Sequence, residues 1–101
     1  MDKDIDIVSI RLDAIKATYS RNEEMLKHIE ESARVCDVST EIIYLGLLLV
    51  DKYSDVLFEI KYARQCGLSE EKITAALRQS VADDTIQPLK MMYTDKGGGT
   101  E

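Results

Sequence analysis

The sequence predicts an all-α protein: a long antiparallel helical hairpin and a shorter third helix, completed as a helical bundle by a second copy of the chain. Three observations support this prediction. Apolar residues recur at intervals of three and four over the first third of the chain, a nine-residue apolar stretch follows, and one turn sequence occurs twice. Intervals of three and four place apolar side chains on one face of a helix, whereas strands alternate with a period of two.

The first predicted helix covers residues 4–36. Its apolar seam consists of residues three or four positions apart: Ile5, Val8, Leu12, Ile15, Tyr19, Asn22, Leu26, Ile29, Ala33 and Cys36. Neither glycine nor proline interrupts this spacing, which is typical of one side of a coiled coil. Asn22 is the only polar member. A buried Asn22 would set the register or the oligomeric state; alternatively, the helix bends around residues 20–22 and Asn22 meets water.

A turn sequence that occurs twice predicts where helices end and begin. Residues 33–43 and 63–73 are identical at six of eleven positions. In each copy one residue suits the left-handed conformation that commonly ends a helix, and a serine two positions later can cap the next helix. These positions are Asp37 and Ser39 in the first copy, and Gly67 and Ser69 in the second. The two copies therefore predict two corners between helices.

The second predicted helix covers residues 40–66 and the third covers residues 70–83. The second begins with the run 42–50, which is apolar on every helical face. A hairpin alone cannot cover such a run, and a second copy of the chain is the economical cover, so we expect a homodimer. The residues expected in the dimer or partner interface are Asn22, Ile43, Tyr44, Leu47, Leu48 and Val50.

The C-terminal part of the chain offers a second candidate contact. Pro88 prevents a simple continuation of the third helix, so residues 85–93 are expected to be extended or to form one last helical turn. Apolar side chains in this segment either fold back over the open end of the bundle or bind a partner, which flexible methionines suit. The candidates are Leu89, Met91, Met92 and Tyr93. We expect one helical domain over residues 1–93 and a flexible glycine-rich tail over residues 94–101.

Charge and hydropathy limit the classes of partner. The chain has 19 acidic and 13 basic residues, a net charge of −6, and the acidic residues are spread along it without a basic block. Nucleic acid is therefore not an expected partner. A membrane-spanning helix needs about 20 apolar residues, and the longest apolar run here is far shorter. The N-terminal residues also lack the apolar core of a signal peptide, so we expect a cytoplasmic protein without a membrane partner.

No group of residues predicts catalysis, a cofactor or a metal. Cys36 precedes the second predicted helix, and Cys66 ends it. A continuous helix would hold them about 40 Å apart, too far for a disulfide. We expect two reduced thiols packed at helix ends. His28, the only histidine, falls off the apolar seam and is expected at the surface. The sequence therefore predicts a protein that is not an enzyme.

Residues 63–79 resemble the helix-turn-helix signature of DNA-binding proteins, since Ala63, Gly67 and Ile73 have its spacing. Two glutamates open the helix that would enter the groove, and phosphates repel them. The helix before the turn is also expected to be too long for a compact motif. We therefore predict a non-enzymatic protein that binds another protein as an adaptor, regulator or inhibitor. A helix-turn-helix transcriptional regulator is the alternative, and a self-associating coiled-coil scaffold stays open.

Overall fold

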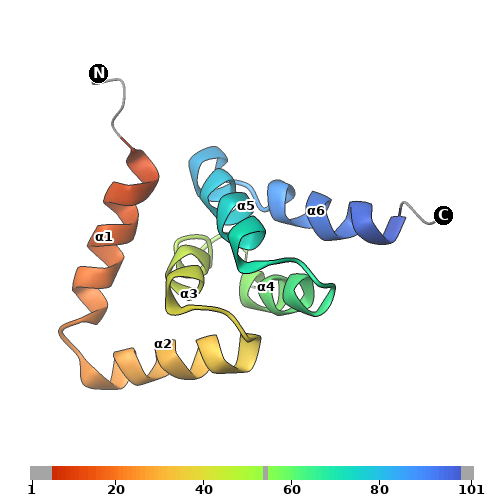
Figure 1. The fold of residues 1–101 in the computed structure, drawn as a ribbon. Helices are drawn as coiled ribbons and strands as arrows, with labels where there is room; N and C mark the ends of the chain where they lie inside the picture. The colour runs from red at the N-terminus through yellow and green to blue at the C-terminus, as the bar shows by residue number, and fades with distance from the viewer. Residues whose placement is uncertain (1–5, 54, 99–101) are drawn as a thin grey trace.

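The protein is all-α, as predicted. A computed structural model describes residues 6–53 and 55–98, with side chains through Met92, and these residues form six helices and no strand (Figure 1). In chain order the helices are α1 (Ile7–Tyr19), α2 (Glu23–Cys36), α3 (Thr40–Leu47), α4 (Val56–Gln65), α5 (Glu70–Asp83) and α6 (Gln87–Gly98). The predicted hairpin of two long helices is not formed, because each long helix is replaced by two shorter ones.

Helix α3 is the centre of the fold. It contacts α1, α2, α4 and α5, while α6 packs against α4 and α5. Helices α1 and α2 meet at a steep angle and enclose α3 from two sides (Figure 1). Most of the largest fully buried side chains come from α3, α4, α5 and α6, and they include Ile42, Leu45, Ile60, Leu77 and Leu89. One chain therefore builds a shared core without a second copy.

The prediction of one helix over residues 4–36 is wrong, and the alternative of a bend at residues 20–22 is confirmed. Asn22 is exposed and caps α2: its side-chain oxygen accepts hydrogen bonds from the Glu24 amide at 2.9 Å and the Met25 amide at 3.3 Å. Asparagine is among the strongest N-cap residues. The bend lets α1 and α2 place their apolar faces against α3 from different directions.

The prediction of one helix over residues 40–66 is also wrong. Helix α3 ends at Leu47, and α4 begins only at Val56. The intervening chain is tied to the end of α5: the Tyr53 hydroxyl donates to the Asp84 carbonyl at 3.0 Å, and Lys52 pairs with the Asp84 carboxylate. The break lets α4 fold back onto α3. Because the run 42–50 is apolar on every helical face, this return of the chain shields part of it from water.

Gly46 allows α3 and α4 to approach closely. A Cβ built on Gly46 would lie 2.8 Å from Cδ1 of Ile60 and 3.3 Å from Cδ2 of Leu57, both on α4. Ile60 is fully buried, so its side chain has little room to move aside. The glycine in the apolar run thus serves packing between these two helices.

Both predicted corners are confirmed. Asp37 and Gly67 adopt positive φ angles of 60° and 97°. The same hydrogen bond closes each corner: Val38 N donates to Ala33 O at 3.0 Å, and Leu68 N donates to Ala63 O at 3.2 Å. A bond with this spacing satisfies a carbonyl of the last helical turn. The alanine that recurs in the two copies is therefore the acceptor position of the corner.

The serine caps differ between the two corners. The Ser69 hydroxyl accepts from the Lys72 amide at 3.2 Å, whereas Ser39 is the N-cap of α3 by position without such a side-chain bond. Helix α5 has the predicted bounds, and its C-cap residue, Asp84, has a left-handed φ of 61°.

The C-terminal segment forms a longer helix than expected. Helix α6 runs from Gln87 to Gly98, so the expectation of an extended segment or a single turn over residues 85–93 is wrong. Residues 94–98 of the predicted tail are helical, and residues 99–101 lie outside the described residues. Ile86 and Leu89 belong to the core, which fixes the start of α6 on the body of the protein.

Candidate protein-binding surface

The residues expected in a dimer interface lie in different environments. Ile43 and Tyr44 are only 1% and 8% exposed and belong to the core of a single chain. Leu47, Leu48 and Val50 are half-buried and pack against that core, and Asn22 is exposed at the bend. The chain's own helices cover the apolar run, so the need for a second copy to cover it disappears. Dimerisation itself remains a prediction.

Helix α1 supplies part of that cover. The rings of Tyr19 and Tyr44 meet edge to face, with centroids 6.0 Å apart and planes at 85°. The Lys16 ammonium lies 6.0 Å from the centroid of the Tyr44 ring, within the range of a cation–π contact. Tyr44 is therefore held between α3 and α1 in the same chain.

The residues expected in a C-terminal contact divide between core and surface. Leu89 is fully buried, Met92 is half-buried, and Met91 is 54% exposed. The side chain of Tyr93 lies outside the described residues. Leu89 and Met92 fold back onto the bundle, as one of the two sequence interpretations expects. Met91 is exposed, and a partner contact there stays a prediction.

An apolar hollow lies where α5 meets α6, and we call it the methionine groove. It has a volume of about 420 Å³ and is lined by Ala75, Ala76, Pro88, Met91 and Met92. None of the lining side chains is charged. The sequence indicated the two methionines beside Pro88 but not the alanines, because no local pattern pairs residues 75 and 76 with this segment. The groove is an open apolar hollow on the described surface.

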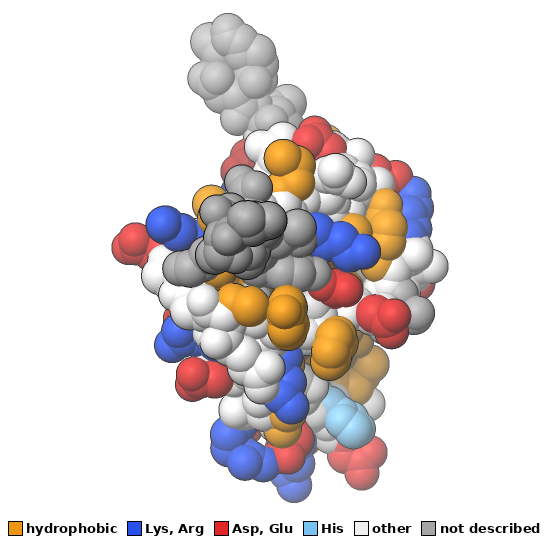
Figure 2. All heavy atoms as spheres, turned by 90° about the vertical axis from the view of Figure 1, so that its right-hand side faces the viewer, with side chains coloured by type: hydrophobic (Ala, Val, Ile, Leu, Met, Phe, Trp, Pro, Cys, Tyr) orange, Lys and Arg blue, Asp and Glu red, His pale blue; other side chains and the backbone are white. Residues whose placement is uncertain are grey.

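Exposed aromatic side chains lie on the neighbouring helix α4. The rings of Phe58 and Tyr62 stack with centroids 6.3 Å apart and an interplanar angle of 14°, and the side chains are 65% and 44% exposed. Figure 2 views the side of the molecule on which α4 and α6 lie, and hydrophobic side chains gather across its middle among charged ones. Sequence reasoning missed this pair, although an aromatic outside the apolar seam of its helix is the signal that could have found it.

The two cysteines are free thiols in different surroundings. Cys36 is buried, its sulfur lies 3.8 Å from the Leu57 carbonyl oxygen, and burial raises the pKa of this thiol. Cys66 is half-buried beside Tyr62, and its thiol raises the pKa of the tyrosine hydroxyl. The helix between the cysteines is broken, so the distance expected from a continuous helix does not apply. The prediction that both thiols are packed at helix ends is confirmed.

Thiol labelling should separate the two cysteines. We expect Cys66 to react first with a thiol-specific reagent and Cys36 to react roughly tenfold or more slowly, since its thiol is exposed only by opening of the fold. Burial raises the pKa of the Cys36 thiol in the folded protein above its pKa in the unfolded chain. The stability that the buried thiol contributes is therefore complete below the pKa of the unfolded chain. It is lost as the pH rises through the pKa of the folded protein. C66A should keep only the slow phase and C36A only the fast one; equal rates would contradict the assignment.

His28 lies on the exposed face of α2, where Glu24, Lys27 and Glu31 share a shallow hollow with it. Among the side chains that the structure describes, which end at Met92, no cluster of three or more from histidine, cysteine and acidic residues could hold a metal ion. The charges on α2 therefore form a solvated surface.

The segment that resembles a helix-turn-helix is compact. Helix α4 has only ten residues, so the expectation that the first helix is too long for the motif is wrong. Helix α5, however, contacts α1, α3, α4 and α6, which leaves it a narrow exposed face. Arg78 is engaged by Asp6 of α1's N-cap and is not directed to solvent alone. The first turn of α5 carries Glu70 and Glu71, which oppose phosphate binding.

Comparisons with protein-family models, with curated proteins and with solved structures gave no match. None of the described helices combines the length and the hydropathy that crossing a bilayer requires.

Proposed function

We propose that this protein is not an enzyme and acts by binding another protein, as an adaptor, regulator or inhibitor, through the methionine groove. The observation that supports this proposal is the groove itself: an apolar hollow of about 420 Å³ between α5 and α6 with no charged lining residue. Methionine side chains have three rotatable bonds and a polarisable sulfur, so they adapt to different apolar surfaces.

The occupant that suits the groove best is an apolar face of a partner helix with basic residues at its edges. A groove between two helices takes side chains that project from one face of a third helix. The chain carries a net charge of −6, so a basic partner gains favourable long-range attraction and faster association. Ala75 and Ala76 are small, which leaves room for a large side chain beside Met91 and Met92.

A matched pair of substitutions tests this function. Met91 and Ile10 are almost equally exposed, at 54% and 55%, but Ile10 lies on α1 away from the groove. M91E should abolish capture of a specific partner from the cell of origin, and I10E should leave capture unchanged. A photo-crosslinking residue at position 91, but not at position 10, should join the same partner covalently. Equal capture by both variants would contradict the groove.

DNA binding remains the alternative function, supported by the compact α4–turn–α5 unit over residues 63–79. Phosphate contacts make DNA affinity fall steeply with salt, so low salt is the most permissive condition. We expect no mobility shift of duplex DNA even at about 50 mM salt. A salt-dependent shift that Lys72→Glu removes would favour the regulator over the protein-binding module.

A further inference from the structure

Helix α1 is attached to the body of the protein by a small part of its surface. Val8 and Leu12 are its only buried side chains among the described residues, and Ile15 and Tyr19 are half-buried against the core. Its contacts reach α3 and α5 on the far side of the bend. The opposite face is open, with Ile10 55% exposed. An element with so few anchors can leave its site at a modest cost.

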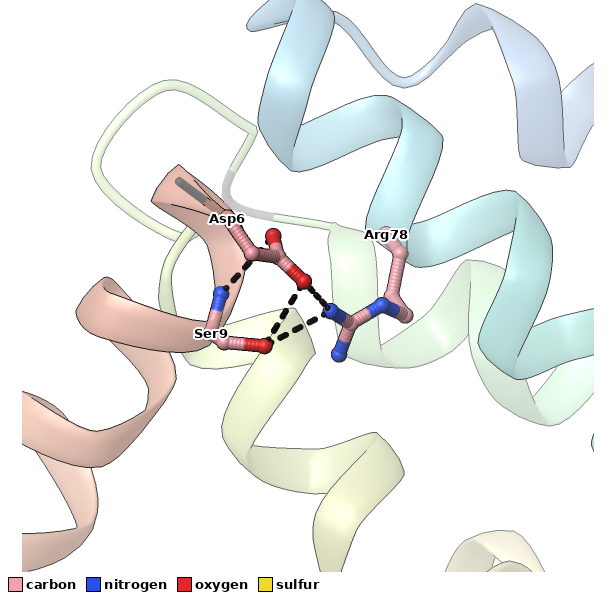
Figure 3. Close-up of polar contacts among 3 residues, drawn as sticks. All are labelled: Asp6, Ser9 and Arg78. Carbon is pink, nitrogen blue, oxygen red and sulfur yellow. Dashed lines mark hydrogen bonds and ion pairs between the residues drawn. The ribbon is translucent and has the colours of Figure 1, made fainter. Parts of the chain in front are cut away.

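A polar latch fixes the free end of α1 on α5. Arg78 Nη2 lies 2.5 Å from Asp6 Oδ2 and donates to Ser9 Oγ at 2.9 Å, and the Ser9 hydroxyl in turn donates to Asp6 Oδ2 at 2.8 Å (Figure 3). The Ser9 amide also donates to Asp6 Oδ1 at 3.2 Å. This cluster joins residues 72 positions apart in the sequence. The bend is the covalent link between α1 and the helices that follow it. Asp6 of a second copy can therefore make the same contacts with Arg78.

The bend replaces a helix that the sequence would otherwise allow. The apolar spacing passes through residues 20–22 without a change of register and without glycine or proline. Backbone bonds from Ser20 to Lys16, at 2.9 Å, and from Leu26 to Asn22, at 3.0 Å, have the four-residue spacing of an α-helix. Asn22, at φ −137° and ψ 113°, leaves that conformation. Its side chain binds the two amides that, in a continuous helix, would bind the carbonyls of residues 20 and 21.

We propose that α1 exchanges between two copies of the chain. In the exchanged dimer, residues 7–36 form one continuous helix, α1 packs on α3 and α5 of the second copy, and Asp6 binds Arg78 of that copy. The contacts of α1 with α3 and α5 are retained, whereas its contacts with α2 at the bend are replaced by the continuous helix. The two forms therefore differ at the bend and in the entropy of association. This dimer does not use the methionine groove, and it goes beyond the proposed function by stating how two copies associate.

Two substitutions at the bend test the exchange in opposite directions. N22A removes the cap that stabilises the bend and places a strong helix former there. A lost cap corresponds to about a fivefold change per bend, and therefore to about a 25-fold increase in the dimerisation constant. E23P does the reverse. Position 23 is the first residue of α2, where proline is tolerated, and the extended backbone of Asn22 is compatible with a following proline.

Proline inside the continuous helix would disfavour the dimer by more than about a hundredfold per bend. E23P should thus be monomeric at every concentration with an unchanged helix content. Light scattering over a concentration series, with circular dichroism on the same samples, gives both readouts. An N22A protein that stays monomeric throughout, or an E23P protein that dimerises like the original chain, would overturn the proposal.

Charge reversal in the latch tests whether residue 6 contacts residue 78 of its own chain or of the second copy. In a closed monomer, D6R places two positive charges together and R78D places two negative charges together. In an exchanged heterodimer of D6R and R78D, both latches join opposite charges. An equimolar mixture should therefore contain more heterodimer than the statistical half, measured by native mass spectrometry. A statistical mixture, or monomers alone, would contradict the exchange. M91E should leave this distribution unchanged, so failure of the groove and failure of the exchange are distinguishable.

Discussion

L45A should lower the free energy of unfolding by about 3 kcal/mol, the largest effect we expect from one substitution. Leu45 is fully buried on α3, the helix that contacts α1, α2, α4 and α5. Removing the branched end of the Leu45 side chain leaves a cavity that the surrounding helices fill only in part. Domains of this kind have only about 5–15 kcal/mol of stability, so a large fraction would be lost.

Urea denaturation followed by circular dichroism measures this loss as a lower midpoint at an unchanged slope. The control is F58A on α4, where the side chain is 65% exposed, and its effect should stay within about 0.5 kcal/mol. A midpoint for L45A equal to that of F58A would show that α3 is not the centre of the core.

R64A should cost about 2 kcal/mol, because Arg64 links the two corners that the sequence writes twice. Its Nε donates to the Asp37 carbonyl in the first corner at 2.9 Å, and its Nη1 donates to the Leu68 carbonyl in the second at 3.3 Å. The Asp37 carboxylate lies 3.5 Å from the same Nε. With its side chain 32% exposed, Arg64 is partly shielded from water, which strengthens bonds from a charged donor.

The repeat supplies a matched control for this substitution. Arg34 occupies the equivalent position in the first copy, but it pairs with Glu31 on its own helix, and both side chains are mostly exposed. Exposed pairs contribute little to stability, so R34A should leave the urea midpoint unchanged. Equal losses for R64A and R34A would mean that helix propensity, not the link between corners, determines the effect.

Local signals in the sequence were sufficient to predict the corners. Asp37 and Gly67 adopt the left-handed conformation expected of them, and Ser69 caps α5 as predicted. Helix α5 has the predicted bounds. Each of these outcomes depends on residues within one turn of the helix end, where backbone hydrogen bonds have few alternatives. The all-α class follows from the same periodic pattern.

The lengths of the first two predicted helices could not be decided locally. At Asn22, the apolar seam favours a continuous helix while the side chain favours a cap, and both are compatible with the neighbouring residues. Within a single chain, the distant contacts of α1 with α3 and α5 require the bend. The apolar run 42–50 presents the same difficulty, since a pattern apolar on every face does not say whether the cover comes from the same chain or from another.

The candidate surface was partly predictable for a related reason. Met91 and Met92 are conspicuous in the sequence because they lie beside Pro88 in a short apolar segment. Their partners Ala75 and Ala76 are ordinary helix residues until α6 folds back across α5. A groove formed by two helices has no signature within either of them.

The 72-residue separation of the latch has a consequence during synthesis on the ribosome. Chains grow at about 5–20 residues per second, so Asp6 is made about 4–14 seconds before Arg78. During this interval α1 has left the ribosome while the helix that anchors it is still unmade. On a messenger carrying several ribosomes, the α5 that becomes available first belongs to the chain ahead. The order of translation therefore lets α1 of the trailing chain meet α5 of the chain ahead before the trailing chain can close on itself.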